Sequence, residues 1–231
     1  MTRPGGPDRI EGPGPFAAGF GVSRETIERL ETYADLLKQW QRGVNLVAPS
    51  TLAVVWERHF ADSAQLAALA PAGLRVWVDL GSGAGFPGLV VAIMLADPAR
   101  AGNAVRMVLV ESDNRKAAFL REVVRRTGLD AARVAVDILS ARIENITTQG
   151  SLESVDVVSA RALAPLDRLL ALSAPLFGAQ TMGVYLKGRE AEREVEAARK
   201  RWSFSADLVP SLTDPDGRIV VVRALRARTE D

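Results

Sequence analysis

The sequence of 231 residues contains no cysteine. Disulfides, zinc ribbons, iron–sulfur clusters and a thiolate nucleophile are therefore excluded, and we expect no metal site. Long hydrophobic runs are also missing. None approaches the roughly 18 residues that a membrane-spanning helix needs, and the N-terminal region has no apolar core of a signal peptide. We therefore expect a cytoplasmic protein with no membrane partner.

An excess of charge of either sign is absent too. Lysine and arginine number 29 against 28 for aspartate and glutamate, which gives a net charge of +1. Many nucleic-acid-binding domains are strongly basic, so this balance does not by itself indicate RNA or DNA as a partner. The hydrophobic fraction of 48% and charged fraction of 25% are typical of a soluble globular chain.

Three regions of the chain differ in their residue pattern. Residues 1–22 hold many glycines and prolines without periodicity, which predicts a flexible arm. In residues 23–72 apolar side chains recur at helical spacing, which predicts an N-terminal helical cap. Strands and helices alternate through residues 73–231, which predicts an α/β main domain with a mostly parallel sheet covered on both faces.

The patterns also place the individual elements. Turn residues 214–217 separate the last two expected strands, so we expect an antiparallel hairpin at the end of a Rossmann-like, doubly wound sheet of seven strands. The expected helices are 23–43, 50–70, 87–96, 114–127, 140–146, 165–176 and 190–202. The expected strands are 75–80, 105–111, 133–137, 155–160, 181–187, 205–209 and 218–224.

A glycine-rich segment joins the first expected strand to the next helix. Residues 79–88 are DLGSGAGFPG, with alternate glycines at Gly81, Gly83 and Gly85. Such spacing allows a sharp turn and a close approach of the backbone to a ligand. The same letters fit the G-x-G-x-x-G pattern of dinucleotide-binding folds, so the glycines alone do not decide between cofactors.

Two acidic residues near the glycines favour S-adenosylmethionine over a nicotinamide dinucleotide. Asp79 lies two positions before the first glycine, where methyltransferases place a carboxylate near the methionyl amine. Glu111 ends the next expected strand, where it can accept hydrogen bonds from both ribose hydroxyls. In dinucleotide-binding folds the ribose-binding acid follows the loop by about 20 residues.

Several segments resemble the bacterial glucose-inhibited division protein B family, also called RsmG. The resemblance covers the chain after the arm, and its R-H-x-x-D-S and S-R-A segments are more specific than the glycine loop. The matching segments are Trp40…Asn45-Leu46, Arg58-His59-Phe60-Ala61-Asp62-Ser63, residues 79–88, Glu111-Ser112…Arg115-Lys116…Phe119-Leu120, Arg142-Ile143-Glu144, Ser159-Ala160-Arg161-Ala162 and Leu186-Lys187-Gly188.

The resemblance implies a class I S-adenosylmethionine-dependent methyltransferase. It implies transfer of a methyl group to N7 of one guanine in the decoding-region loop of 16S ribosomal RNA, within the small subunit or its assembly intermediate. It further implies cofactor contacts at Gly81, Phe86, Ile143, Glu144 and Arg161, and we take Arg161 as the candidate catalytic residue. One departure is Glu111, where many members have aspartate, but either carboxylate can hold a ribose.

The residue types present are compatible with this target. Guanine N7 has a lone pair and no proton, so its methylation needs positioning more than a general base. The segment Ser159-Ala160-Arg161-Ala162 differs from the N-P-P-Y type that acts on exocyclic amines, and methylation at pyrimidine C5 usually needs a cysteine. Two alternatives stay open on the sequence, namely a nicotinamide-dependent oxidoreductase and a non-catalytic regulator that keeps the cofactor fold.

Arg58, His59 and Lys187 are the candidates for RNA contact. His59 is the only histidine and lies in an apolar helical pattern, where histidine is more often structural. Lys187 can meet a phosphate or be solvated, and Arg161 can equally form a surface salt bridge. The basic helix at 114–127 is more often a solvated face than an RNA patch.

Overall fold

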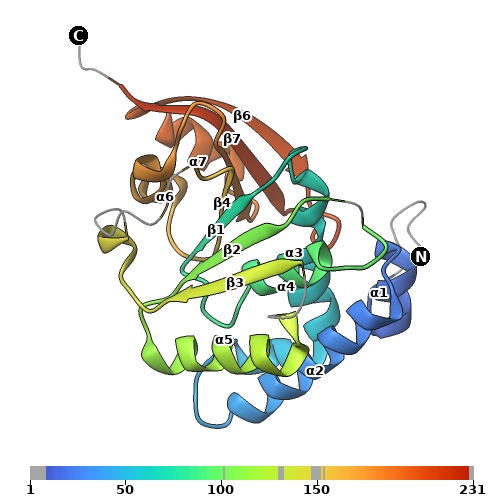
Figure 1. The fold of residues 1–231 in the computed structure, drawn as a ribbon. Coiled ribbons are helices and arrows are strands. Elements are labelled where there is room, and N and C mark those ends of the chain that lie inside the picture. Colours follow the sequence, from blue (N-terminus) through green and yellow to red (C-terminus); the bar gives the residue numbers. More distant parts are fainter. Residues whose placement is uncertain (1–8, 101, 130–132, 147–151, 153, 229–231) are drawn as a thin grey trace, which may run out of the picture.

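A central sheet organises the molecule, which is described here by a computed structural model (Figure 1). The structure describes residues 9–100, 102–129, 133–146, 152 and 154–228. The seven-stranded sheet has the order β3-β2-β1-β4-β5-β7-β6, in which β7 is antiparallel to both its neighbours. The expected sheet and closing hairpin are confirmed. The strands are β1 Val76–Leu80, β2 Val105–Val110, β3 Val134–Leu139, β4 Val157–Arg161, β5 Met182–Lys187, β6 Trp202–Pro210 and β7 Arg218–Ala227.

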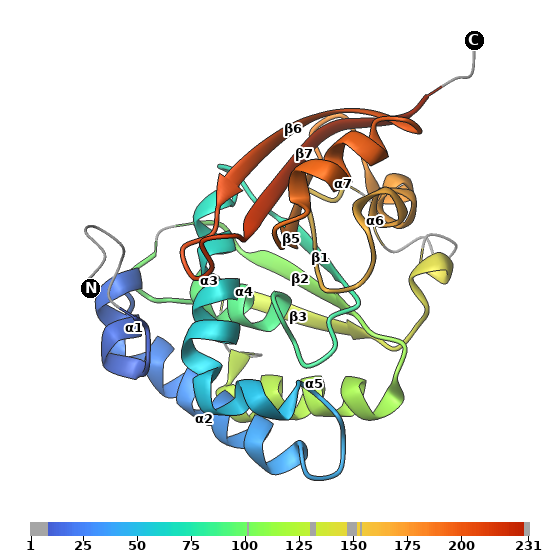
Figure 2. The same ribbon diagram turned by 180° about the vertical axis from the view of Figure 1, so that it is seen from behind.

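Helices cover both faces of the sheet, as Figures 1 and 2 show from opposite sides. Side chains alternate along each strand, so Trp77 of β1 packs into one core and its neighbour Val78 into another. The first core holds residues of α4 (Gly88–Leu95) and α5 (Asn114–Thr127), and the second those of α6 (Leu166–Ser173) and α7 (Ala191–Ala198). Both sheet faces are therefore buried, which explains the nearly continuous apolar strands.

The N-terminal cap shares the first of these cores. Helix α2 (Arg24–Trp40) begins at the N-cap Ser23, whose side chain accepts a hydrogen bond from the Thr26 amide. Tyr33 of α2 is fully buried and its ring lies 6.1 Å from the ring of Phe119 on α5. The cap is thus packed directly against the helix layer of the sheet.

The second helix expected in the cap is not a regular α-helix. Its residues form the 3₁₀ helix η1 (Pro49–Val54), the π-helix η2 (Trp56–Ala61), a single α-turn α3 (Asp62–Ala64) and the 3₁₀ helix η3 (Gln65–Leu69). The helical segment expected over 50–70 is therefore present, but it changes helix type along its length. Hydrogen bonds of His59 and Asp62 to Arg161 on β4 accompany the wide π turn, and such tertiary contacts can outweigh local helical preference.

The prediction of a flexible arm over 1–22 is wrong for its second half. Pro13–Phe20 forms helix α1, and the side chain of Phe16 is buried with its ring 5.5 Å from that of Trp56. Proline is compatible with the first helical turn, where the missing N–H has no helical partner, so the composition misled the prediction. Residues 1–8 lie outside the described part of the chain.

Smaller differences concern element ends. The helix expected over 190–202 ends at Ala198, because Trp202 starts β6. The helix expected over 140–146 is only the 3₁₀ turn η5 (Ile143–Asn145), and the one expected over 165–176 ends as the 3₁₀ turn η7 (Ala174–Leu176). Within the described residues, no helix is both long and apolar enough to span a membrane.

Candidate active site

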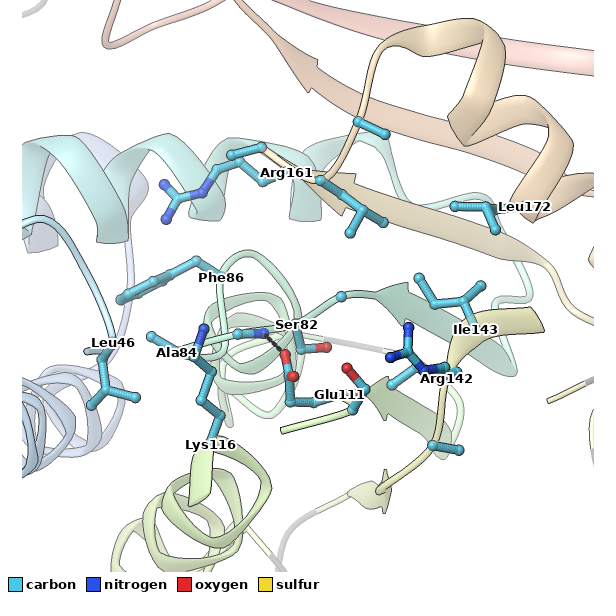
Figure 3. Close-up of a pocket in the computed structure, with 18 of the residues that line it drawn as sticks. Leu46, Ser82, Ala84, Phe86, Glu111, Lys116, Arg142, Ile143, Arg161 and Leu172 are labelled. Carbon is cyan, nitrogen blue, oxygen red and sulfur yellow. Dashed lines mark hydrogen bonds between the residues drawn. The ribbon is translucent and has the colours of Figure 1, made fainter. Parts of the chain in front are cut away.

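The carboxyl ends of the parallel strands meet at one edge of the sheet, where the following loops enclose a cavity of about 530 Å³. We call it the first cavity. Residues 81–84 and Phe86 of the loop after β1 line it, together with Glu111 after β2 (Figure 3). Gly83 has φ +57°, a conformation that residues with a Cβ rarely adopt, so the backbone itself forms this wall. Ligands bind at this edge in open α/β sheets.

Glu111 is mostly buried and its carboxylate lies beneath the glycine loop (Figure 3). One oxygen accepts a hydrogen bond from the Gly83 amide at 2.8 Å, and the other accepts one from the Asp113 amide at 2.7 Å. A carboxylate has about four acceptor sites, so Glu111 keeps capacity for further donors. It therefore both holds the loop and presents acceptors to the first cavity.

Asp79 and Gly85 occupy different positions from those expected. The Asp79 carboxylate is buried, accepts hydrogen bonds from the Ser159 hydroxyl (2.6 Å) and the Gly88 amide (3.2 Å), and does not line the cavity. Burial raises its pKa to about 6. Gly85 also lies outside the lining, because it packs where a Cβ would come within 2.5 Å of the Tyr33 hydroxyl. The geometry thus gives both residues a role in packing the loop.

The other residues expected at the cofactor line the first cavity. Gly81, Ile143 and Glu144 contribute to its walls. Phe86 lies between two stacked rings, that of Tyr33 at 5.4 Å and that of His59 at 4.7 Å between centroids. The structure therefore brings together loop residues from four strand ends, as the sequence predicted.

Arg161 ends β4 and is tied to the N-terminal cap. Its Nη1 donates to the Arg58 carbonyl and to the Asp62 carboxylate, both at 3.1 Å, and its Nη2 donates to Nδ1 of His59 at 2.9 Å. The guanidinium carbon also lies 4.9 Å from the centroid of the Phe86 ring. Burial lowers the pKa of Arg161 while Asp62 opposes the shift, and arginine stays charged. Arg161 does form a salt bridge, as the alternative expected, but its side chain is only 17% exposed, so the pair with Asp62 is not a surface one.

His59 is held as a neutral ring. Burial and the positive charges of Arg161 and Arg58 lower its pKa to about 3. Because Arg161 can only donate, Nδ1 accepts and Nε2 carries the proton, which it donates to the Thr51 hydroxyl at 2.7 Å. Thr51 in turn donates to the Ala48 carbonyl at 2.7 Å. Both ring nitrogens therefore have partners within the protein, which supports a positioning role.

The R-H-x-x-D-S segment also reaches the loop between β6 and β7. Asp62 accepts a hydrogen bond from the Thr213 hydroxyl at 3.0 Å, and Gln65 accepts one from the Leu212 amide at 2.9 Å. The Arg58 guanidinium lies 3.7 Å from the Asp214 carboxylate. One short segment thus fixes Arg161 on one side and the hairpin loop on the other.

The Lys187 ammonium group is bonded within the protein. Its Nζ donates to the Ala164 carbonyl at 2.7 Å and to the Glu194 carboxylate at 2.8 Å, and its side chain is 8% exposed. Glu194 also accepts from the Leu166 amide. Lys187 lines the second cavity described below with its charge already paired, so its RNA contact stays a prediction, and Arg58 is half exposed.

A second cavity of about 390 Å³ adjoins the first. Leu46, Val47, Arg161 and Ala162 line both. The segment of Leu46 and Val47, which we call the strap, is held by the Gln41 side chain. The Gln41 amide oxygen accepts from both strap amides at 3.0 Å, and its nitrogen donates to the Val47 carbonyl at 2.8 Å.

Sequence reasoning missed the strap and Gln41. The resemblance contained Asn45-Leu46, but nothing in the spacing placed this loop in the site. It also missed Arg142 and Arg168, which line the first cavity. Arg168 carries no local signal, because it is one charged residue on an amphipathic helix.

Comparisons with known proteins decide the family. The family model for rRNA small subunit methyltransferase G matches residues 26–225. The chain belongs to this family. A protein named ribosomal RNA small subunit methyltransferase G from Parvibaculum lavamentivorans is 49% identical over 221 residues, which are 96% of this chain and 92% of that protein. One of the same name from a Methylobacterium species is 50% identical over 208 residues, 90% of this chain and 93% of that protein.

Solved structures share the fold. An O-methyltransferase from Bacillus cereus in complex with SAH has a TM-score of 0.54 at 17% identity, over 84% of this chain and 90% of that one. Aeropyrum pernix fibrillarin with bound S-adenosyl-L-methionine has a TM-score of 0.51 at 16% identity, over 71% and 76%. The expected family, the class I methyltransferase fold and the S-adenosylmethionine-dependent methyltransferase activity are confirmed, and the oxidoreductase alternative has no support.

Proposed function

We propose that this chain transfers the methyl group of S-adenosylmethionine to N7 of one guanine in the decoding-region loop of 16S ribosomal RNA. The substrate is the small ribosomal subunit or its assembly intermediate, which places the protein in the cytoplasm. The observation that carries the proposal, beside the family, is a pair of adjoining cavities that meet at Leu46, Val47, Arg161 and Ala162. Two reactants can meet at such a junction.

The first cavity fits the cofactor. Its volume of about 530 Å³ lies in the range of small-molecule sites. The spare acceptor capacity of Glu111, beside the open backbone of Gly83, suits a ribose with two hydroxyls. Arg142, Arg168 and Lys116 also line this cavity and can neutralise the carboxylate of the methionyl part. The donor and acceptor set therefore matches a nucleoside linked to an amino acid.

The junction suits attack by a group that has no proton to lose. S-adenosylmethionine supplies a methyl group on a positively charged sulfur. The N7 lone pair forms the new N–C bond as the S–C bond breaks, the bond pair stays on sulfur, and the positive charge passes to the guanine ring. No proton moves. The four residues shared by the two cavities include no general base, and His59 has both nitrogens bonded within the protein. What the residues supply is positioning.

The proposal is tested with labelled S-adenosylmethionine and small subunits from a strain that lacks the activity. We expect label at one guanine, mapped by cleavage at 7-methylguanine, and no label in subunits from the parent strain, where the site is already modified. Free 16S rRNA in a parallel reaction defines the form of the substrate. Label at a different atom or in a different RNA would contradict the proposal, and tight cofactor binding without any transfer would favour the non-catalytic regulator.

A further inference from the structure

The second cavity is built from the end of β4, which contributes Arg161 and Ala162, and from three other parts of the chain that are far apart in sequence. The cap contributes Thr51 and Arg58, the end of β5 contributes Gly188, and the β6–β7 loop contributes Ser211 and Asp214. The Asp62 and Gln65 hydrogen bonds described above join the cap to the hairpin loop. The cap and the hairpin loop are thus fixed to one another by hydrogen bonds that are partly buried.

Arg161 has donors to spare at the junction of the two cavities. A guanidinium has five N–H groups, of which three donate to Arg58, Asp62 and His59. The remaining two, one on Nη2 and one on Nε, have no hydrogen-bond partner among the residues that the structure describes. A largely buried cation with unused donors at a cavity wall marks a place for an acceptor.

We propose that the second cavity takes the target guanine, swung out of the RNA strand, with Arg161 donating a hydrogen bond to its O6. The inference rests on the proposed function, since it needs guanine N7 to face the first cavity. N7 and O6 lie side by side on the same edge of guanine. A base whose N7 meets the methyl group at the junction therefore presents O6 to the guanidinium. The volume of about 390 Å³ is of the size of a small-ligand cleft.

This placement agrees with how proteins approach a base for chemistry. Methyltransferases take the base out of the stack, and sequence-specific RNA binding favours unpaired bases in loops. It also separates guanine from adenine, because adenine carries an amino donor where guanine has O6, and arginine cannot accept from it. Arg161 is thereby a specificity residue as well as part of the junction.

Gly188 allows the second cavity to be filled without touching the first. It lines only the second cavity, and a Cβ at this position meets no heavy atom within 4 Å. We expect Gly188→Phe to lower single-turnover methyl transfer to small subunits by about 100-fold or more, because the base is displaced. The affinity for S-adenosylhomocysteine should stay within about threefold of wild type, which is about 0.65 kcal/mol of binding free energy.

Three controls make the result specific. Gly14→Phe adds the same side chain on exposed α1, where a Cβ also meets nothing within 4 Å, and should leave transfer unchanged. Gly188→Ala changes the same backbone with little added volume and should lower transfer far less than Gly188→Phe. If thermal unfolding shows that Gly188→Phe is not folded, Gly188→Leu is measured in its place. Small subunits whose target guanine is replaced by adenine keep N7 but lose O6, and should be methylated at least about 100-fold more slowly.

The outcomes separate this inference from the proposed function. Wild-type protein that transfers no methyl group to small subunits refutes the proposed function and this inference with it. Active wild type with an equally active Gly188→Phe overturns the base site alone. So does parallel loss of S-adenosylhomocysteine binding in that variant, which would assign Gly188 to the cofactor site. Equal rates on guanine and adenine subunits would overturn the contact of Arg161 with O6.

Discussion

The two cavities differ in how the chain builds them. The first is lined mainly by the loops that follow β1, β2, β3 and β4, so each part follows its own strand in the sequence. The second joins the ends of β4 and β5 to the β6–β7 loop and the cap, and hydrogen bonds of Asp62 and Gln65 hold the cap to that loop. A cofactor site can thus be coded locally, whereas the proposed acceptor site depends on the assembled fold. Variants in each region should therefore fail in different measurements.

The largest effect is expected from Gly83→Val, in the locally coded region. A β-branched residue is strained at φ +57°, and its side chain would enter the first cavity. We expect methyl transfer to fall by more than about 100-fold, with loss of S-adenosylhomocysteine binding. Gly73→Val is the matched control, because Gly73 has φ +78° in an exposed turn that lines neither cavity. Equal cofactor affinity in the two variants would contradict the role of the loop.

The next largest loss of activity is expected from Arg161→Lys, because Arg161 lines both cavities. A lysine cannot reproduce three directed hydrogen bonds together with contact to the Phe86 ring. We expect a fold that persists and a loss of about 100-fold in single-turnover transfer. Thermal unfolding and transfer are measured on one preparation. Near-normal transfer would remove Arg161 from the active site, and a parallel collapse of stability would assign it a structural salt bridge.

Glu111→Ala should weaken cofactor binding, because it removes acceptors in the first cavity and also the hydrogen bond that holds the Gly83 amide. Charge-assisted hydrogen bonds of about 1.5–3 kcal/mol correspond to a roughly 10- to 150-fold weaker dissociation constant. Calorimetry with S-adenosylhomocysteine measures it, and Glu122→Ala on the exposed face of α5 serves as the control. Unchanged affinity would show that the ribose lies elsewhere, even though the Glu111 carboxylate lines the first cavity.

Gln41→Ala tests the strap that divides the two cavities. The substitution removes three hydrogen bonds to the backbone of Leu46 and Val47. We expect about tenfold slower transfer at saturating cofactor and RNA, because small displacements of a site wall reduce the rate. Ser23→Ala removes the N-cap of the same helix, costs about 1 kcal/mol of stability, and should leave the rate unchanged. If both variants lose equal activity, the effect of Gln41 is on stability only.

The sequence predicted most of the first region for a physical reason. Apolar runs and glycines specify strand ends and a sharp turn, and parallel strands bring those ends to one edge. These patterns place Glu111 at the site, whereas the contact of Phe86 is implied by the family resemblance. Asp79 could not be placed correctly, because alternation along β1 turns its side chain toward the core, where Ser159 and Gly88 hold it.

The second region escaped prediction because its signals are tertiary. The R-H-x-x-D-S segment was noticed, yet its π-helical form and the contacts of His59 and Asp62 with Arg161 depend on β4, about a hundred residues further along the chain. Helix α1 escaped prediction for the same reason. Its Phe16 packs against Trp56, which lies 40 residues further along the chain, and the glycine- and proline-rich neighbours of Phe16 give no sign of this contact. Spacing rules describe single elements and cannot supply such partners.

The smallest effect, and the sharpest contrast with Glu111, is expected for Asp79→Asn. Asp79 lines neither cavity, so the affinity for S-adenosylhomocysteine should change by less than about threefold, or about 0.65 kcal/mol of binding free energy. The substitution should instead change how stability depends on pH. Burial raises the pKa of Asp79 from 3.8 to about 6, so the folded protein binds a proton between these values that the unfolded chain has released.

The sign of this pH effect follows from linkage. The contribution of Asp79 to the free energy of unfolding is full below pH 3.8 and is lost as pH rises through about 6. Asparagine does not titrate, so the stability of wild type relative to Asp79→Asn should fall by about 2 kcal/mol between pH 4 and pH 7. His59, whose pKa is lowered to about 3, acts in the opposite direction, but equally in both proteins, and cancels in the difference. Urea unfolding at several pH values measures that difference. A stability difference that does not change with pH would mean that the pKa of Asp79 is the same in the folded and unfolded protein. A loss of cofactor affinity in Asp79→Asn would show that Asp79 belongs to the cofactor site.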